Sequence, residues 1–182
     1  MVCERGNGCG SMTVAEYEEQ AAVTASYAEG SVYPYLGLIE EIGEAAGIIA
    51  KAERDNGGVL DEVRREQLKA ELGDVLWMIA AVARDYDLTL HQDEEPNFSA
   101  EGHPTHPSYV LFGILSETAG SLMLGFDAPS CQPERDIGVL LTVWEDLCFA
   151  YGFKPVDVAA ANLEKLASRK QRGVIHGEGD NR

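Results

Sequence analysis

The chain has 182 residues, of which 31 are Asp or Glu and 14 are Lys or Arg, so its formal net charge is −17 at pH 7. A chain of this length forms one domain or one duplicated unit, and its charge argues against a nucleic acid polymer or an anionic membrane as a partner. No signal-peptide pattern is present and no apolar run approaches the roughly 20 residues that span a bilayer, so we expect a cytoplasmic protein.

Helical patterns follow a Gly-rich opening, residues 1–12, which we interpret as a flexible leader. A capping box at Thr13 and Glu16 predicts a first helix that runs to about Gly30. No stretch alternates polar and apolar residues over a useful length, so the expected fold is an all-α helical bundle over 13–171. The other helices are predicted over 32–56, 62–86, 108–125, 134–151 and 155–171, with a polar loop over 93–107 and a Gly-rich tail over 172–182.

Two parts of the chain are similar to each other, which predicts an internal duplication. The segment "YPYLGLIEE" at 33–41 matches "YVLFGILSE" at 109–117, and "ELGDVL" at 71–76 matches "DIGVLL" at 136–141. The copies would cover about 13–97 and about 107–171. Because the identities are few, a chance likeness between two helical pairs is the alternative.

Acidic residues interrupt two of the predicted apolar helices. In "EEIGE", Glu40, Glu41 and Glu44 span an arc of only about 100° on a helix. In "ELGD", Glu71 and Asp74 are three residues apart and therefore share a face. Buried carboxylates that close together repel one another, unless a divalent cation lies between them. An all-oxygen set of this kind is typical of Mg²⁺ or Mn²⁺, whereas the alternative is a solvated acidic face.

These motifs are also those of a known family. "EEIGE" followed by "ELGD" resembles the EExxE…ExxD signature of the MazG-like all-α nucleotide pyrophosphohydrolases, and "ANLEKLASRK" resembles their Asn-x-x-Lys-Leu-x-x-Arg tail. The resemblance implies Mg²⁺-dependent hydrolysis of a (deoxy)nucleoside triphosphate between the α and β phosphates, giving a monophosphate and pyrophosphate. It implies that Glu41, Glu44, Glu71 and Asp74 hold Mg²⁺, for which the ligand chemistry also allows Mn²⁺. Glu40 and Glu41 are the candidate catalytic residues, and Glu40 is either the general base or an outer-shell ligand.

Basic and polar residues supply candidates for contacts with the nucleotide. Lys51 lies about 20° from Glu40 on the helical wheel, so it is a candidate for the same site, and the alternative is an ordinary solvated lysine. Residues of the C-terminal helix recur at helical spacing, and for the tail beyond it there are two alternatives: it closes over the nucleotide, or it is disordered without ligand. The full set of predicted substrate-binding residues is Lys51, Asn162, Lys165, Arg169, Arg172, Asp180 and Arg182.

The two copies differ in their acidic residues. The second copy has Ser116, Gly120 and Val139 where the first has Glu40, Glu44 and Asp74. The first copy in turn has Asn97 without the Lys-Leu that follows Asn162 in the second. This complementary loss predicts one composite site for each chain, with metal ligands from the first half and substrate contacts from the second. In this interpretation a dimer has been fused into one chain, which can stand alone or form a further homodimer.

Two functions other than hydrolysis remain open at this point. A non-enzymatic helical bundle that binds a divalent metal for a structural or regulatory role would use the same carboxylates. A helical module for protein–protein contacts would need neither the metal nor the acidic pairs. Nothing in the pattern selects the base or the sugar of the nucleotide.

Overall fold

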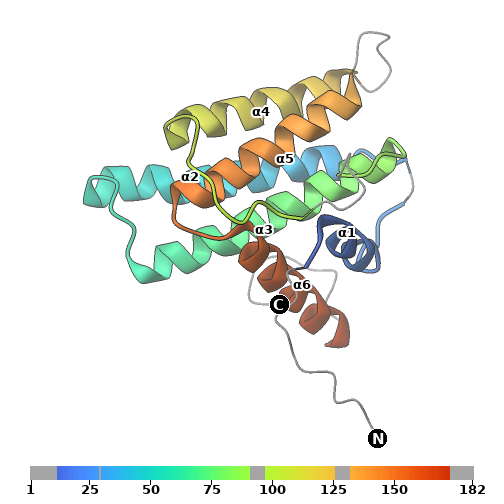
Figure 1. Ribbon diagram of the computed structural model, residues 1–182, viewed down its shortest axis with the longest axis horizontal. Coiled ribbons are helices and arrows are strands. Elements are labelled where there is room, and N and C mark those ends of the chain that lie inside the picture. Colours follow the sequence, from blue (N-terminus) through green and yellow to red (C-terminus); the bar gives the residue numbers. More distant parts are fainter. Residues whose placement is uncertain (1–11, 29, 91–96, 126–131, 173–182) are drawn as a thin grey trace, which may run out of the picture.

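The computed structural model describes residues 12–28, 30–90, 97–125 and 132–172, and in these ranges the regular elements are six α-helices (Figure 1). A single isolated β-bridge, Thr13 with Asn97, is the one extended pairing in the same ranges. The expected all-α class is therefore confirmed. The helices are α1 (Val14–Ala22), α2 (Tyr33–Asn56), α3 (Glu62–Asp85), α4 (Ser108–Gly125), α5 (Pro133–Ala150) and α6 (Pro155–Gln171).

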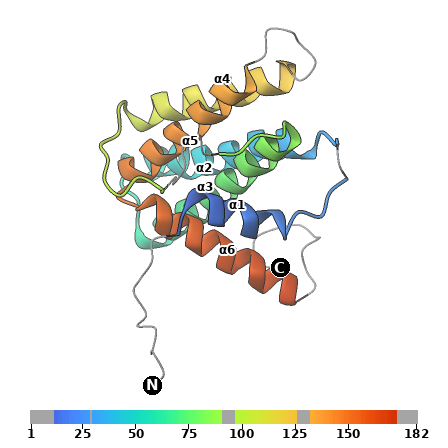
Figure 2. The same cartoon turned by 45° about the vertical axis from the view of Figure 1, so that its right-hand side comes forward.

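Helix α3 is the central element of the bundle. It packs against α2, α5, α6 and α1, and most of the residues along its second half are buried. Figures 1 and 2 both show the α4/α5 pair on one side of the α2/α3 pair, with α1 and α6 on the other. Helix α2 contacts α4 and α3 contacts α5, which is the pairing that a two-fold relation between the halves would give. The duplication itself stays a prediction.

Helix α1 begins as predicted but ends early. The Thr13 side chain accepts a hydrogen bond from the Glu16 backbone N–H, and Glu16 accepts from the Thr13 N–H, which completes the capping box. The helix then ends at Ala22, so the prediction that it reaches about Gly30 was wrong. The Thr24 hydroxyl donates to the Ala21 carbonyl (2.7 Å) and accepts from Trp77 Nε1 (2.9 Å). A contact with α3 therefore stabilises the helix end.

The ends of α2 and α3 follow local sequence signals. Gly57, with φ of +61°, ends α2 in the left-handed conformation that favours glycine. The Asp61 side chain then accepts a hydrogen bond from the Arg64 backbone N–H and begins α3. The short turn between them sets the two acidic helices side by side.

Two close contacts hold α5 and α6 against α3. Trp144 is fully buried, and its Nε1 donates to the Leu72 carbonyl at 2.7 Å. At Gly73 an added Cβ would lie only 2.9 Å from the Cβ of Asn162, so glycine is needed for α6 to approach this closely. In the described ranges, none of the helices is both long and apolar enough to cross a membrane.

Candidate metal and nucleotide site

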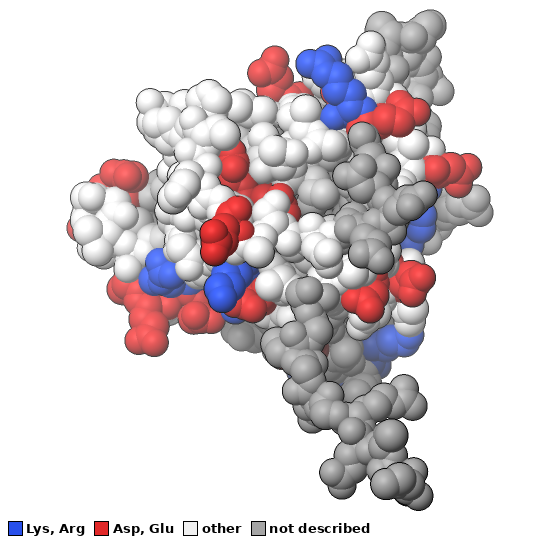
Figure 3. Space-filling model, viewed as in Figure 1, with Lys and Arg blue, Asp and Glu red and all other residues white. Residues whose placement is uncertain are grey.

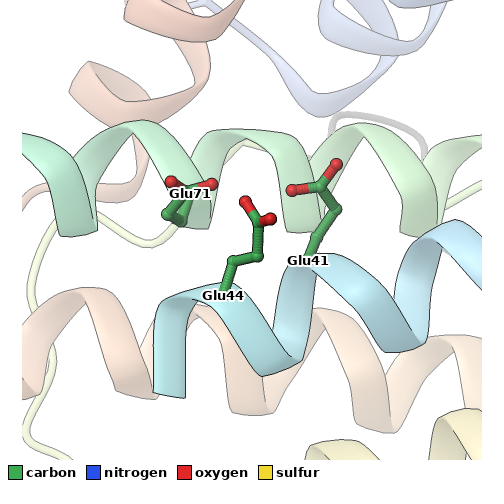
Figure 4. Close-up of side chains that lie close together, drawn as sticks. All are labelled: Glu41, Glu44 and Glu71. Carbon is green, nitrogen blue, oxygen red and sulfur yellow. The ribbon is translucent and has the colours of Figure 1, made fainter. Parts of the chain in front are cut away.

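Three glutamates from two helices meet between α2 and α3. Glu41 and Glu44 are one turn apart on α2, and Glu71 projects from α3 (Figure 4). Each offers one carboxylate oxygen, and these three oxygens all lie within 4.8 Å of one another. In the described ranges this is the one such group of three or more metal-binding side chains. Hard divalent cations prefer an all-oxygen set of this kind.

The charges in this three-glutamate group are crowded. The pKa of Glu41 is raised from 4.5 to about 8, mainly by burial and then by the nearby carboxylates of Asp74, Glu71 and Glu44, whereas Lys165 opposes the shift. Glu71 is only 7% exposed. A bound dication would offset this mutual repulsion, so the donor set and its electrostatics both fit Mg²⁺ or Mn²⁺.

Asp74 lies beside the group but is held by other side chains. Its Oδ1 accepts a hydrogen bond from Asn162 Nδ2 at 2.9 Å, and its Oδ2 accepts from the ammonium of Lys165. Both partners come from α6. The structure thus brings together Asp74 with two of the residues that were predicted to contact the substrate. A role for Asp74 as a fourth metal ligand stays a prediction.

Asn162 is oriented by a residue that the sequence did not single out. The Tyr17 hydroxyl, on α1, donates to Asn162 Oδ1 at 2.9 Å. With its oxygen bonded to Tyr17 and its nitrogen to Asp74, the amide has one favourable orientation. Asn162 is 3% exposed, so its hydrogen bond to Asp74 is made by a buried side chain. No local signal marks Tyr17, because its partner lies 145 residues away along the chain.

A groove opens next to the three-glutamate group, between α2 and α3. Its volume is about 460 Å³, and it shares Glu44 and Glu71 with the group. Two predicted residues line it, Glu40 and Lys51, together with two that the sequence analysis missed, Arg64 and Gln67. The remaining lining residues are Gly43, Gly47 and Ile48.

Gly43 and Gly47 are unusual residues for the middle of α2. Glycine in a helix interior is less favourable than alanine by about 0.8–1.0 kcal/mol. A Cβ added at either position would meet nothing within 4 Å, so neither glycine is required for a close contact between helices. Because neither glycine has a side chain, the part of the groove wall that they form consists of backbone atoms only.

The other predicted substrate contacts are more scattered. Arg169 is buried on α6, with 6% of its surface exposed, and Arg172 is exposed directly after α6. Neither lines the groove. Asp180 and Arg182 lie outside the described residues, so their predicted role stays a prediction.

A second, more apolar pocket of about 300 Å³ lies between α1 and α3. Its wall includes the half-buried Trp77, several alanines and Arg84, but none of the three glutamates. Trp77 packs against the core, and its indole Nε1 donates a hydrogen bond to the Thr24 hydroxyl just after α1. This pocket is therefore separate from the charged groove.

Comparison with known proteins agrees with the geometry. Residues 32–93 match the model of the MazG nucleotide pyrophosphohydrolase domain, a segment that covers both acidic helices. A protein of Mycobacterium phage L5, described as "Gene 37 protein", is 28% identical over 179 residues, which are 94% of this chain and 100% of the phage protein. No solved structure matches the chain significantly.

Proposed function

We propose, on the premise that residues 32–93 match the MazG nucleotide pyrophosphohydrolase domain, that the protein hydrolyses a (deoxy)nucleoside triphosphate between the α and β phosphates. The products would be a nucleoside monophosphate and pyrophosphate. The observation that carries this proposal is the convergence of Glu41, Glu44 and Glu71 within 4.8 Å at the edge of a groove that holds two cationic side chains.

The proposed cofactor is Mg²⁺, with Mn²⁺ as a substitute. Glu41, Glu44 and Glu71 would hold the ion, and Asp74 is the predicted fourth ligand beside them. When bound, the ion would neutralise phosphate charge and make an adjacent water more acidic.

The side chains around the ion have distinct proposed roles. Glu40 is exposed on the groove wall, where a carboxylate can accept a proton from a water, so it is a candidate general base. Glu41, whose pKa lies at about 8 without metal, is the alternative base or a ligand only. Lys51 faces the groove and would contact phosphate oxygens.

The second half of the chain would contribute through α6. Asn162 and Lys165 reach Asp74 from this helix, so they join the carboxylates of the first half at one place. This contact supports the composite site that the duplication predicts. Lys165 is half-buried there and would neutralise part of the acidic charge before the nucleotide binds. Arg169, Arg172, Asp180 and Arg182 remain predicted substrate contacts.

The test is a panel of all ribo- and deoxyribonucleoside triphosphates with Mg²⁺ or Mn²⁺, in which release of pyrophosphate is distinguished from release of single phosphate. We expect pyrophosphate from at least one nucleotide and no release by Glu41→Gln. The matched control is Glu117→Gln, which removes an exposed carboxylate at the corresponding place on α4. Metal binding without turnover across the panel would instead support the non-enzymatic bundle.

A further inference from the structure

We propose that the groove between α2 and α3 holds the pyrophosphate half of the nucleotide, with the β and γ phosphates between Lys51 and Arg64. This inference rests on the proposed function and adds the direction in which the substrate lies. In that reaction a water oxygen bonds to the α phosphorus, and the bond from this phosphorus to the bridging oxygen breaks. Pyrophosphate leaves with the bonding electron pair, while the water gives its proton to the general base, for which Glu40 is the candidate on the groove wall.

The position of the groove places a ligand next to the metal ligands. Glu44 and Glu71 belong both to the three-glutamate group and to the groove lining. An anion in the groove therefore lies beside the proposed ion. Its volume of about 460 Å³ leaves room for two phosphate groups and their hydration.

The distribution of positive charge gives the direction. Lys51 lies seven residues beyond Glu44 on α2, and Arg64 lies seven residues before Glu71 on α3, so both are about 10 Å along their helices from the group. On the other flank, Lys165 is paired with Asp74 and lines a separate, smaller pocket with Lys69 and Glu66. Because the β and γ phosphates carry most of the triphosphate charge, they are expected in the groove, where Lys51 and Arg64 share the lining with Glu44 and Glu71.

Arg64 is held in a position suited to this role. Its guanidinium contacts Asp55 Oδ2 at 3.0 Å and Asp61 Oδ2 at 3.8 Å, and it is partly exposed. A guanidinium has five N–H donors, so it can hold an acidic partner and still bind phosphate. The Gln67 amide, one turn further along α3, is a further donor on the groove wall.

The bare wall of the groove is consistent with a bulky hydrated anion. Gly43 and Gly47 are one turn apart on α2 and both line the groove. Since a Cβ at either position would enter open space, alanine there would reduce the room without disturbing the helix packing. The two glycines therefore allow a test in which stability and binding move in opposite directions.

The experiment measures binding of inorganic pyrophosphate and of nucleoside monophosphate by calorimetry in the presence of Mg²⁺. We expect Arg64→Gln and Lys51→Gln each to raise the pyrophosphate Kd by about tenfold or more, as for loss of a charge-assisted hydrogen bond. Monophosphate binding should change by less than about twofold. Gly43→Ala should raise the Tm by about 2–4 °C and also weaken pyrophosphate binding.

Two matched controls separate the groove from general effects. Arg54 also pairs with Asp55 but does not line the groove, and Gly120 is a mid-helix glycine of α4 with equally open space around it. Arg54→Gln and Gly120→Ala should leave the pyrophosphate Kd within about twofold of that of the unaltered protein.

The outcomes separate this inference from the proposed function. If the unaltered protein hydrolyses a nucleoside triphosphate while the groove variants bind pyrophosphate normally, the inference is overturned and the function stands. Weakened monophosphate binding with normal pyrophosphate binding would place the nucleoside in the groove and would also overturn it. If the unaltered protein neither binds pyrophosphate nor hydrolyses any nucleotide, both proposals fail.

Discussion

The α2/α3 pair and the α4/α5 pair pack in a similar way but differ in charge. The first pair carries the three-glutamate group and the groove, whereas α4 has a single charged residue, Glu117, among its 18 residues. Figure 3 shows a largely uncharged surface over the left part of α4, with acidic and basic side chains at the top edge and lower on this face. Ser116, at the place matching Glu40, donates its hydroxyl to the Phe112 carbonyl within its own helix.

The comparison distinguishes the residues that helix packing requires from the charged residues of the candidate site. Both pairs bury apolar residues such as Leu38 and Leu72 in one half and Leu115 and Leu140 in the other. Among the described residues, only the first pair brings three carboxylates together, and there their repulsion and burial cost free energy. The helix packing does not require these carboxylates, so their presence indicates a function.

The largest expected effect is the loss of a metal ligand in the first pair. Glu71→Gln should weaken Mn²⁺ binding and lower kcat/KM by more than about 100-fold, since even residues that only support metal ligands contribute 10–100-fold. Calorimetry and pyrophosphate release measure the two effects. Asp136→Asn makes the same change at the matching place on α5 and should alter neither. Equal losses in both variants would contradict the contrast between the pairs.

The next effect is a pH dependence that only the first pair should produce. Because the pKa of Glu41 is raised from 4.5 to about 8, the folded protein holds a proton between these pH values that the unfolded chain releases. Without metal, the free energy of unfolding should therefore fall from about pH 5 to pH 8, by on the order of a few kcal/mol. Urea unfolding in EDTA measures this decrease.

Two comparisons check this assignment. Saturating Mn²⁺ should reduce the pH dependence, because the ion replaces the proton. Glu41→Gln should remove it, whereas Glu117→Gln should keep it. A decrease of the same size in Glu41→Gln would show that another group is responsible.

A smaller effect should come from the residue that orients Asn162. Tyr17→Phe removes the hydrogen bond to Asn162 Oδ1, which should lower the free energy of unfolding by about 0.5–1.5 kcal/mol and weaken Mn²⁺ binding by up to about tenfold. Tyr86→Phe removes a hydroxyl that bonds to the Leu122 carbonyl, away from Asp74. It should lower stability only, and weaker metal binding in both variants would rule out a specific role for Tyr17.

The smallest expected effect tests the duplication itself. The double variant Gly120→Glu with Val139→Asp restores the missing acidic residues of the second pair, next to the existing Glu117 and Asp136. If the halves share one geometry, calorimetry should detect a second and weaker Mn²⁺ site. Binding that stays at one site would show that the likeness between the halves does not extend to these faces.

Much of the fold was predictable because its signals are local. The Thr13 capping box, the glycine at position 57 and the Asp61 cap each act within one helical turn, so they can be read from neighbouring residues. The acidic pairs on α2 and α3 were predictable for the same reason, since residues three apart on a helix share a face.

The parts that were missed depend on contacts between helices. The indole of Trp77 meets the end of α1, and Arg64 and Gln67 reach the groove, only because of how α3 packs against its neighbours. The role of Asn162 was predicted as substrate binding, but its burial between Tyr17 and Asp74 follows from the approach of α6 at Gly73. Spacing along one helix contains no information about such partners.

The sequence by itself therefore determined an all-α protein with two acidic helix faces, and it predicted a divalent-metal site there. The tertiary structure alone decided which carboxylates meet, how strongly burial raises the pKa of Glu41, and which cations lie at the groove. The physical reason is distance: propensity and capping act within a few residues, whereas burial and electrostatic coupling depend on side chains that only packing brings together.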